Sequence, residues 1–177
     1  MKRALPFAIA GLMVISTTAS AGGYLGAALG TEPSINDGLH SVAKPFGRSA
    51  RGLAGIRFGH LSLEGALDGF NVLTQRGNQT VYQGSVALKL NLPIGNNFEG
   101  FARGGVERTW LSLDDSKFDF SGNGYQIGAG IEYRLNAILA DASIFLDYSF
   151  HSATLDNTGG HIDTSSGMWG LGLTVGI

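Results

Sequence analysis

The chain contains no cysteine among its 177 residues. This absence excludes both a disulfide framework and a cysteine that could anchor a lipid after a cleaved leader. Proline is also scarce, with four residues in the chain. The three that follow the N-terminal segment, Pro33, Pro45 and Pro93, all fall between the segments predicted below to be strands, as ladder hydrogen bonding demands. The fold must therefore be held together by the pairing of chain segments.

Long apolar runs are missing beyond the N-terminus, so no segment there is predicted to cross a membrane as a helix, which needs about 18 apolar residues. The N-terminal segment itself has Lys2 and Arg3, then an apolar core at residues 4–15 and the sequence Ala-Ser-Ala at residues 19–21. These features predict a secretory signal peptide over residues 1–21. Residues 22–177 are then expected to form one domain.

An excess of positive charge is absent as well. The chain has 12 Lys and Arg against 14 Asp and Glu, a formal net charge of −2, and no basic run. This balance argues against a nucleic-acid partner. Glycine, by contrast, is abundant at 28 residues, roughly twice the average usage. Many of these glycines alternate with large apolar residues, which places them inside predicted strands.

The clearest pattern lies in the segment 125–150, where apolar and polar residues alternate one by one. A period of two is typical of a β-strand. A short break at 136–139 divides the segment into two long strands of an antiparallel hairpin. The apolar face is too long for a small soluble sheet, and the other face carries charges beside glycines, which indicates a narrow polar interior. The pattern predicts part of a transmembrane β-barrel.

The same alternation recurs along the rest of the chain and predicts eight strands. They are expected at about 24–30, 51–58, 61–70, 80–92, 98–113, 125–135, 140–150 and 168–177. Short connections (59–60, 93–97, 136–139) alternate along the chain with long ones (31–49, 71–79, 114–123, 151–165). The sequence therefore predicts an all-β fold, an eight-stranded antiparallel up-and-down transmembrane barrel, with short periplasmic turns, long outer loops and both termini in the periplasm.

A soluble barrel of the lipocalin kind, with its apolar face inward, is the structural alternative. Three features favour the lipid-facing arrangement. The polar face is rich in glycine, aromatic residues such as Tyr133, Tyr82 and Trp169 lie near strand ends, and long and short connections are segregated. The interior of so small a barrel is just wide enough for side chains.

Nine charged residues are expected to face the predicted lumen. They are Arg57, Glu64, Asp68, Lys89, Arg103, Glu107, Glu132, Arg134 and Asp147. One interpretation is a network of ion pairs that locks the barrel, because an isolated charge would be costly there. The other is a path for ions through water between the charges. The strand at 98–113 permits more than one register, and we expect Glu99, Arg103 and Glu107 to point inward.

Candidate sites other than the lumen charges are less clearly defined in the sequence. The four histidines, His40, His60, His151 and His161, have no metal-ligand spacing and are interpreted as polar loop residues. An enzyme at the outer rim could combine His40 with Ser116 and residues 114–115, but no geometry is defined, so no catalytic, cofactor or metal site is expected. Six basic residues could contact lipopolysaccharide phosphates or be solvated loop charges. They are Lys44, Arg48, Arg51, Arg76, Arg108 and Lys117.

Four segments carry a family resemblance: residues 24–30, residues 101–110, Gly128-Ala-Gly-Ile-Glu-Tyr133 and Leu146-Asp-Tyr148. Through them the chain resembles the transmembrane domain of the outer-membrane protein A family. The resemblance implies an eight-stranded barrel with a salt-bridged interior, sometimes called a gated pore, and roles in envelope integrity and surface interaction.

Two departures from the family qualify that resemblance. Because the last predicted strand ends at Ile177, no periplasmic peptidoglycan-binding domain is expected. Ala28 and Phe145 stand where the best-known member has a lysine and an arginine, so a charge-swapping gate is not expected unless another cation substitutes.

The leading hypothesis is a non-enzymatic, integral protein of the outer membrane of a Gram-negative bacterium that contributes to envelope integrity or surface interactions. A narrow ion-conducting pore and a lipid A-modifying enzyme are the alternatives. The expected partners are outer-membrane lipid, lipopolysaccharide and the barrel assembly machinery, which would read the apolar end of the last strand. The chain is expected to be a monomer without cofactors.

Overall fold

The computed structural model describes residues 21–37, 43–74, 77–111, 120–136, 141–157 and 160–177. These residues form β1 (Ala21–Gly30), β2 (Ser34–Asp37), β3 (Ala43–Phe58), β4 (Leu61–Thr74), β5 (Gly77–Pro93), β6 (Phe98–Leu111), β7 (Phe120–Asn136), β8 (Asp141–Asn157) and β9 (Gly160–Gly176). The segment predicted as a signal peptide lies almost entirely outside the described residues, and its cleavage stays a prediction.

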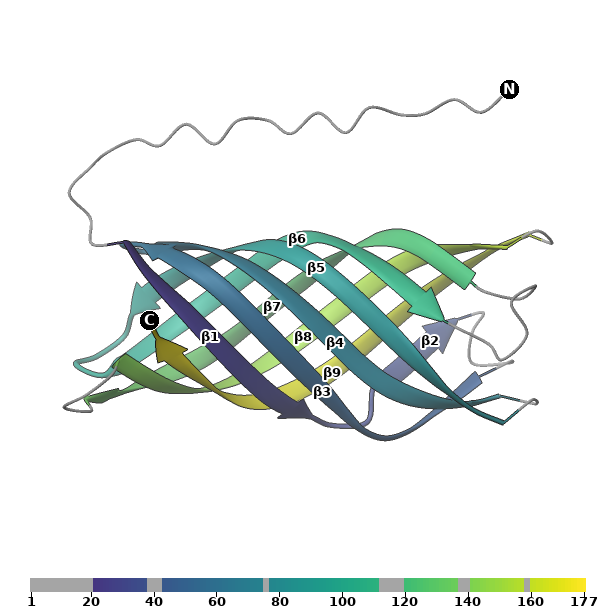
Figure 1. Cartoon of the computed structure of the whole chain (residues 1–177), viewed down its shortest axis with the longest axis horizontal. Coiled ribbons are helices and arrows are strands. Elements are labelled where there is room, and N and C mark those ends of the chain that lie inside the picture. Colours follow the sequence, from purple (N-terminus) through teal and green to yellow (C-terminus); the bar gives the residue numbers. More distant parts are fainter. Residues whose placement is uncertain (1–20, 38–42, 75–76, 112–119, 137–140, 158–159) are drawn as a thin grey trace, which may run out of the picture.

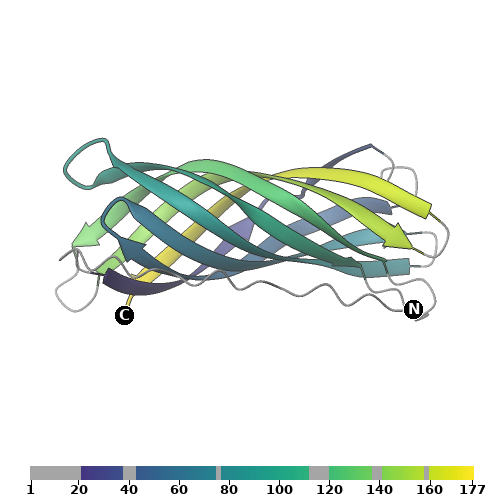
Figure 2. The same cartoon turned by 90° about the horizontal axis from the view of Figure 1, so that it is seen from above.

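The strands form a closed antiparallel barrel (Figure 1). Each long strand pairs with the next along the chain, and β1 closes the sheet by pairing with β9, for example Ala27 with Leu173. The short β2 continues beside β9 where β1 ends. The barrel is elongated with steeply tilted strands in both views, and the start of β1 and the C-terminus lie at the same end (Figures 1 and 2). The predicted eight-stranded up-and-down barrel is confirmed.

At the end of the barrel opposite the C-terminus, the strands are longer than the sequence predicted. β4 reaches Thr74 and β5 begins at Gly77, so the predicted loop at 71–79 is wrong. β8 and β9 likewise extend over most of the predicted loop at 151–165, and β7 begins within the predicted loop at 114–123. The reason is that most outward-facing residues of these extensions, such as Asn71, Asn78 and Thr154, are polar. Asn71 accepts a hydrogen bond from Thr80 across the β4–β5 hairpin, and such residues look like loop residues in a sequence.

Burial settles which face of the sheet points outward. Leu88 is 62% exposed, whereas its neighbour Lys89 is 5% exposed. The same alternation continues around the barrel and gives an apolar outer belt with buried polar residues inside, which is the reverse of a lipocalin. At the end that holds the start of β1 and the C-terminus, Phe98 and Tyr133 pack with ring centroids 4.8 Å apart, as in an interfacial aromatic girdle. Among the described residues there is no helix that is long and apolar enough to cross a membrane.

The register of β6 is also resolved. Lys89 pairs with Arg103, and Ser85 pairs with Glu107, in the β5–β6 ladder. Glu99, Arg103 and Glu107 all lie on the buried face. Their placement fixes the pairing of charges in the lumen that is described below.

The outer belt makes a testable prediction at Leu88. Replacing it with arginine places a charge on the lipid face, which costs about 2–4 kcal/mol near the bilayer midplane. We expect Leu88→Arg to lower the free energy of unfolding in lipid vesicles by that amount, measured by urea titration of tryptophan fluorescence.

The matched control is Leu73→Arg. Leu73 also faces outward and is 49% exposed, but it lies one residue from the outer end of β4, opposite Lys44 and Asn78. An arginine there is expected to cost about 0–1 kcal/mol, because the penalty falls toward the interface. An equal loss at both positions would contradict the position assigned to the lipid belt.

Candidate functional site in the barrel lumen

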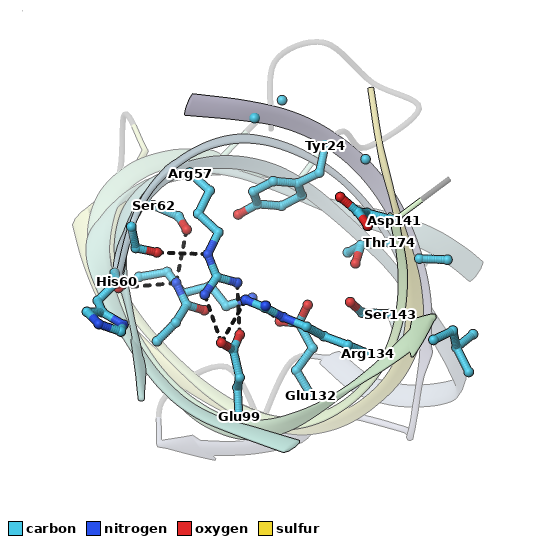
Figure 3. Close-up of a pocket in the computed structure, with 18 of the residues that line it drawn as sticks. Tyr24, Arg57, His60, Ser62, Glu99, Glu132, Arg134, Asp141, Ser143 and Thr174 are labelled. Atoms are coloured by element: carbon cyan, nitrogen blue, oxygen red, sulfur yellow. Dashed lines mark hydrogen bonds and ion pairs between the residues drawn. The ribbon is translucent and has the colours of Figure 1, made fainter. Parts of the chain in front are cut away.

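An open vestibule lies at the end of the barrel that holds the start of β1 and the C-terminus. It is a cavity of about 690 Å³ whose lining is largely polar (Figure 3). Arg57 from the end of β3 makes a bidentate pair with Glu99 at the start of β6, with N–O distances of 2.8 and 2.9 Å. Arg134 from β7 donates to the same carboxylate at 2.7 Å. Two guanidinium groups therefore hold one carboxylate at the mouth of the lumen.

A second ion pair lies deeper in the vestibule. Lys89 Nζ is 2.8 Å from Glu132 Oε2, and both side chains are buried. The same ammonium lies 4.2 Å from the centroid of the Phe101 ring, within the range of a cation–π contact. Tyr24 donates to Glu64 Oε2 at 3.0 Å. The Tyr24 ring fits in this position because it packs against Gly55, which has no side chain. A Cβ added at Gly55 would lie 2.4 Å from a carbon of the Tyr24 ring.

An apolar layer follows immediately beyond the vestibule. Phe101 and Phe145 stand two residues beyond Glu99 and Ser143 on their strands, and both are buried. They form one cluster with Ala28 and Leu53, so residues from opposite walls of the barrel meet across the lumen. The Phe145 ring lies over Gly172, where an added Cβ would be 2.4 Å from it. This layer occupies the level where the resemblance would place a charged gate.

Arg103 begins the next layer, two residues beyond Phe101. It donates to Glu64 Oε1 at 3.0 Å and to Ser149 Oγ at 2.7 Å, and it is also paired with Asp147. All four residues are buried. Arg103 on β6 thereby connects β4 with β8 on the other side of the lumen.

Arg51 completes the ion network and corrects a prediction. The sequence placed it among the rim residues that could contact lipopolysaccharide, but it is 7% exposed and points into the lumen. Its Nε lies 2.6 Å from Asp68 Oδ1, and its Nη1 lies 2.9 Å from Asp147 Oδ2. The prediction failed because Arg51 was read as the first residue of a strand, whereas β3 begins eight residues earlier, at Ala43. Asp147, held by both guanidinium groups, is the centre of the network.

His151 is a second correction. The sequence interpreted it as a loop residue, but β8 continues to Asn157 and buries His151 in the lumen. Its Nδ1 lies 2.6 Å from Glu107 Oε2. Gln126 on the neighbouring strand donates to Ser85 Oγ at 3.0 Å. Beyond the arginines the lumen is therefore polar, with one carboxylate paired to an imidazole.

An outer apolar cluster lies where the hairpins extend beyond the lipid belt. Val72 is two residues from the end of β4, and Leu155 is two residues from the end of β8. The cluster draws residues from β2, β4, β5, β8 and β9, so it spans the lumen. Its members are Ile35, Phe70, Val72, Val81, Leu155 and Met168. No alternation rule identified it, because these positions fell in or beside the predicted loops.

The structure brings the nine predicted lumen charges together unevenly. Seven are buried, while the Arg57 and Arg134 side chains are 23% and 47% exposed at the vestibule.

Of the predicted rim residues, Lys44, Arg48 and Arg108 are exposed. Arg76, Lys117, His40 and residues 114–116 lie outside the described residues. His60 is exposed at the β3–β4 turn. Within the described ranges, no group of three or more His, Asp or Glu could hold a metal ion.

Comparison with known families identifies the architecture. The profile of the family described as outer membrane protein beta-barrel domain matches residues 4–176. The chain belongs to this family. This outer-membrane barrel is therefore integral to the outer membrane of a Gram-negative bacterium, as the sequence predicted. A search of curated protein sequences found no match.

Solved outer-membrane barrels share the fold. Neisserial surface protein A superposes with a TM-score of 0.65 at 17% identity, over 88% of this chain and 97% of that one. The N-terminal barrel of OprF from Pseudomonas aeruginosa gives 0.53 at 14% identity, over 88% and 99%. Ail, the attachment invasion locus protein of Yersinia pestis, gives 0.52 at 14% identity, over 89% and 97%. At these identities the similarity describes the fold alone.

Proposed function

We propose that this outer-membrane barrel is a non-enzymatic, non-conducting protein that contributes to envelope integrity and surface contacts. The observation that carries the proposal is the filling of the lumen: two apolar clusters span it, one on each side of a buried ion network. A conducting pore needs a continuous hydrated path, and an enzyme needs an accessible group of reactive residues. The packed lumen supports neither role.

Surface contacts are the second part of the proposal. Lys44, Arg48 and Arg108 are exposed, and the Arg108 guanidinium lies 5.8 Å from the Trp110 ring. Guanidinium and ammonium groups bind phosphates well, so these side chains suit lipopolysaccharide headgroups. One structural neighbour is named a surface protein, and another is named an attachment invasion locus protein. We propose the same setting for this chain, as a monomer delivered by the barrel assembly machinery.

A deletion strain tests the proposal. We expect loss of the protein to raise sensitivity to detergent and to large antibiotics, and expression of the wild-type chain to restore resistance. The triple variant Lys44→Gln, Arg48→Gln and Arg108→Gln should fold and yet restore resistance only in part.

Two results would contradict the proposed function. One is a deletion strain with unchanged detergent sensitivity and unchanged binding of surface ligands. The other is a changed acyl pattern of lipid A, measured by mass spectrometry with and without the protein, since that result would indicate a lipid-modifying enzyme.

A further inference from the structure

Seven side-chain oxygen atoms are buried without a hydrogen-bond partner among the described residues, and four of them form a group in the lumen on the neighbouring strands β4, β5 and β6. These four are Asp68 Oδ2, Gln83 Oε1, Thr109 Oγ1 and Glu107 Oε1. Each belongs to a side chain that is at least nine-tenths buried. Leaving such a group unsatisfied costs about 1–3 kcal/mol, and more when it is charged. Four on one wall of the lumen therefore indicate that something else occupies the space they face.

The strand register places these four residues side by side. Asp68 on β4 pairs with Gln83 on β5, and Gln83 pairs with Thr109 on β6. Glu107 lies two residues before Thr109 on the same face of β6. Directly paired side chains have Cβ atoms about 4.5–5.5 Å apart, so the four oxygen-bearing groups form one contiguous patch. The patch lies between the arginine network and the outer apolar cluster.

The charges around the patch do not balance. Between the vestibule and the outer apolar cluster, the described lumen residues include two cations, Arg51 and Arg103. Four carboxylates accompany them: Glu64, Asp68, Glu107 and Asp147. Lys89 and Glu132 at the vestibule pair with each other. The carboxylates outnumber the guanidinium groups by two, and they still outnumber the cations by one if His151, whose Nδ1 lies 2.6 Å from Glu107 Oε2, is counted as a cation. Water could satisfy the unpaired oxygens, but it would not reduce this excess of negative charge, and uncompensated buried charge is strongly unfavourable.

We propose that the patch binds an alkali metal cation, with water completing its coordination shell. Carboxylate, amide and hydroxyl oxygens are the ligands that hard cations prefer. A monovalent ion fits better than a divalent one for two reasons. No group of three acidic or histidine ligands gathers in the described part of the lumen, and the Arg51 guanidinium, 2.6 Å from Asp68 Oδ1, would repel a doubly charged ion. The inference does not depend on the proposed function of the barrel surface.

Refolding in different salts tests the site. The full mature chain is folded into lipid vesicles in sodium or potassium chloride, and in choline chloride of equal ionic strength. We expect a higher urea midpoint of unfolding in the alkali salts, with a shift that saturates as the alkali concentration rises. Glu107→Gln should abolish the shift, and Thr109→Val, a milder change of similar size, should weaken it. Glu99→Gln, which removes a vestibule carboxylate, should retain the shift.

Heavy-ion substitution gives a direct readout. Crystals of the wild-type barrel refolded in rubidium or thallium salts are expected to show an anomalous peak within coordination distance of Gln83 Oε1 and Glu107 Oε1. Equal midpoints in choline and alkali salts together with no peak would overturn the proposal in favour of water alone. A midpoint shift given by calcium and not by sodium or potassium would overturn the assignment of an alkali ion.

Discussion

Deletion of residues 173–177 is expected to abolish folding into the outer membrane while secretion to the periplasm continues. These residues close the barrel. In the β1–β9 ladder, residues 173–176 pair with residues 27–24 of β1. In the β8–β9 ladder, residues 173–175 pair with residues 144–142 of β8. Without them, backbone groups of β1 and β8 would face lipid unpaired, at a cost of several kcal/mol each. The measurement is the heat-modifiable band of the folded barrel in outer-membrane fractions.

A full-length variant provides the control for this truncation. Leu173→Ile combined with Val175→Ile keeps the outward apolar residues and the ladder, so it should give a normal heat-modifiable band. A protease-resistant, heat-modifiable outer-membrane species from the truncated chain would show that the β1–β9 closure is wrong.

Arg103→Met is expected to produce the largest loss of stability among single substitutions in the lumen. Arg103 is the shared partner of Glu64 and Asp147, and all three side chains are almost completely inaccessible. Removing one partner of a buried ion pair leaves an uncompensated charge, which costs about 3–5 kcal/mol. Urea unfolding in lipid vesicles should show a loss of this size, provided that enough of the variant folds.

Arg108→Met is the matched control, because Arg108 is on the same strand but faces outward. Surface substitutions of this kind usually change stability by no more than about 0.5 kcal/mol. A loss at Arg103 as small as the one at Arg108 would mean that the lumen is hydrated and that its charges are not held by pairing.

Alternation predicted the strands and separated their two faces, but it did not say which face points outward. The glycine-rich polar face, the aromatic residues near strand ends and the segregation of long and short connections assigned the apolar face to lipid. The structure agrees, with Leu88 exposed on the outer face and Lys89 buried in the lumen. The same rule failed at the outer ends of the strands. Val72 and Leu155 face inward there, but most outward residues of these extensions, such as Asn71 and Thr154, are polar. A sequence shows such a segment as a loop, and that error also placed Arg51 and His151 outside the lumen.

The contacts within the lumen could not be predicted, for a geometric reason. Arg51 and Asp147 are 96 residues apart and meet across the barrel. Their pairing depends on strand tilt and on the register of every intervening ladder, which local sequence does not specify. The apolar layer needs the same information, because Phe145 fills the lumen only where Gly172 on the next strand leaves space for its ring.

Single-channel recording in planar lipid bilayers tests the central claim, that packed side chains close the lumen. Purified, refolded wild-type protein is expected to insert without steady conductance. The double variant Phe101→Ala and Phe145→Ala removes the inner apolar layer but keeps the outer cluster and the ion network, so it should also stay closed. Steady, ion-selective conductance from most wild-type insertions would contradict the closed lumen and favour a narrow pore.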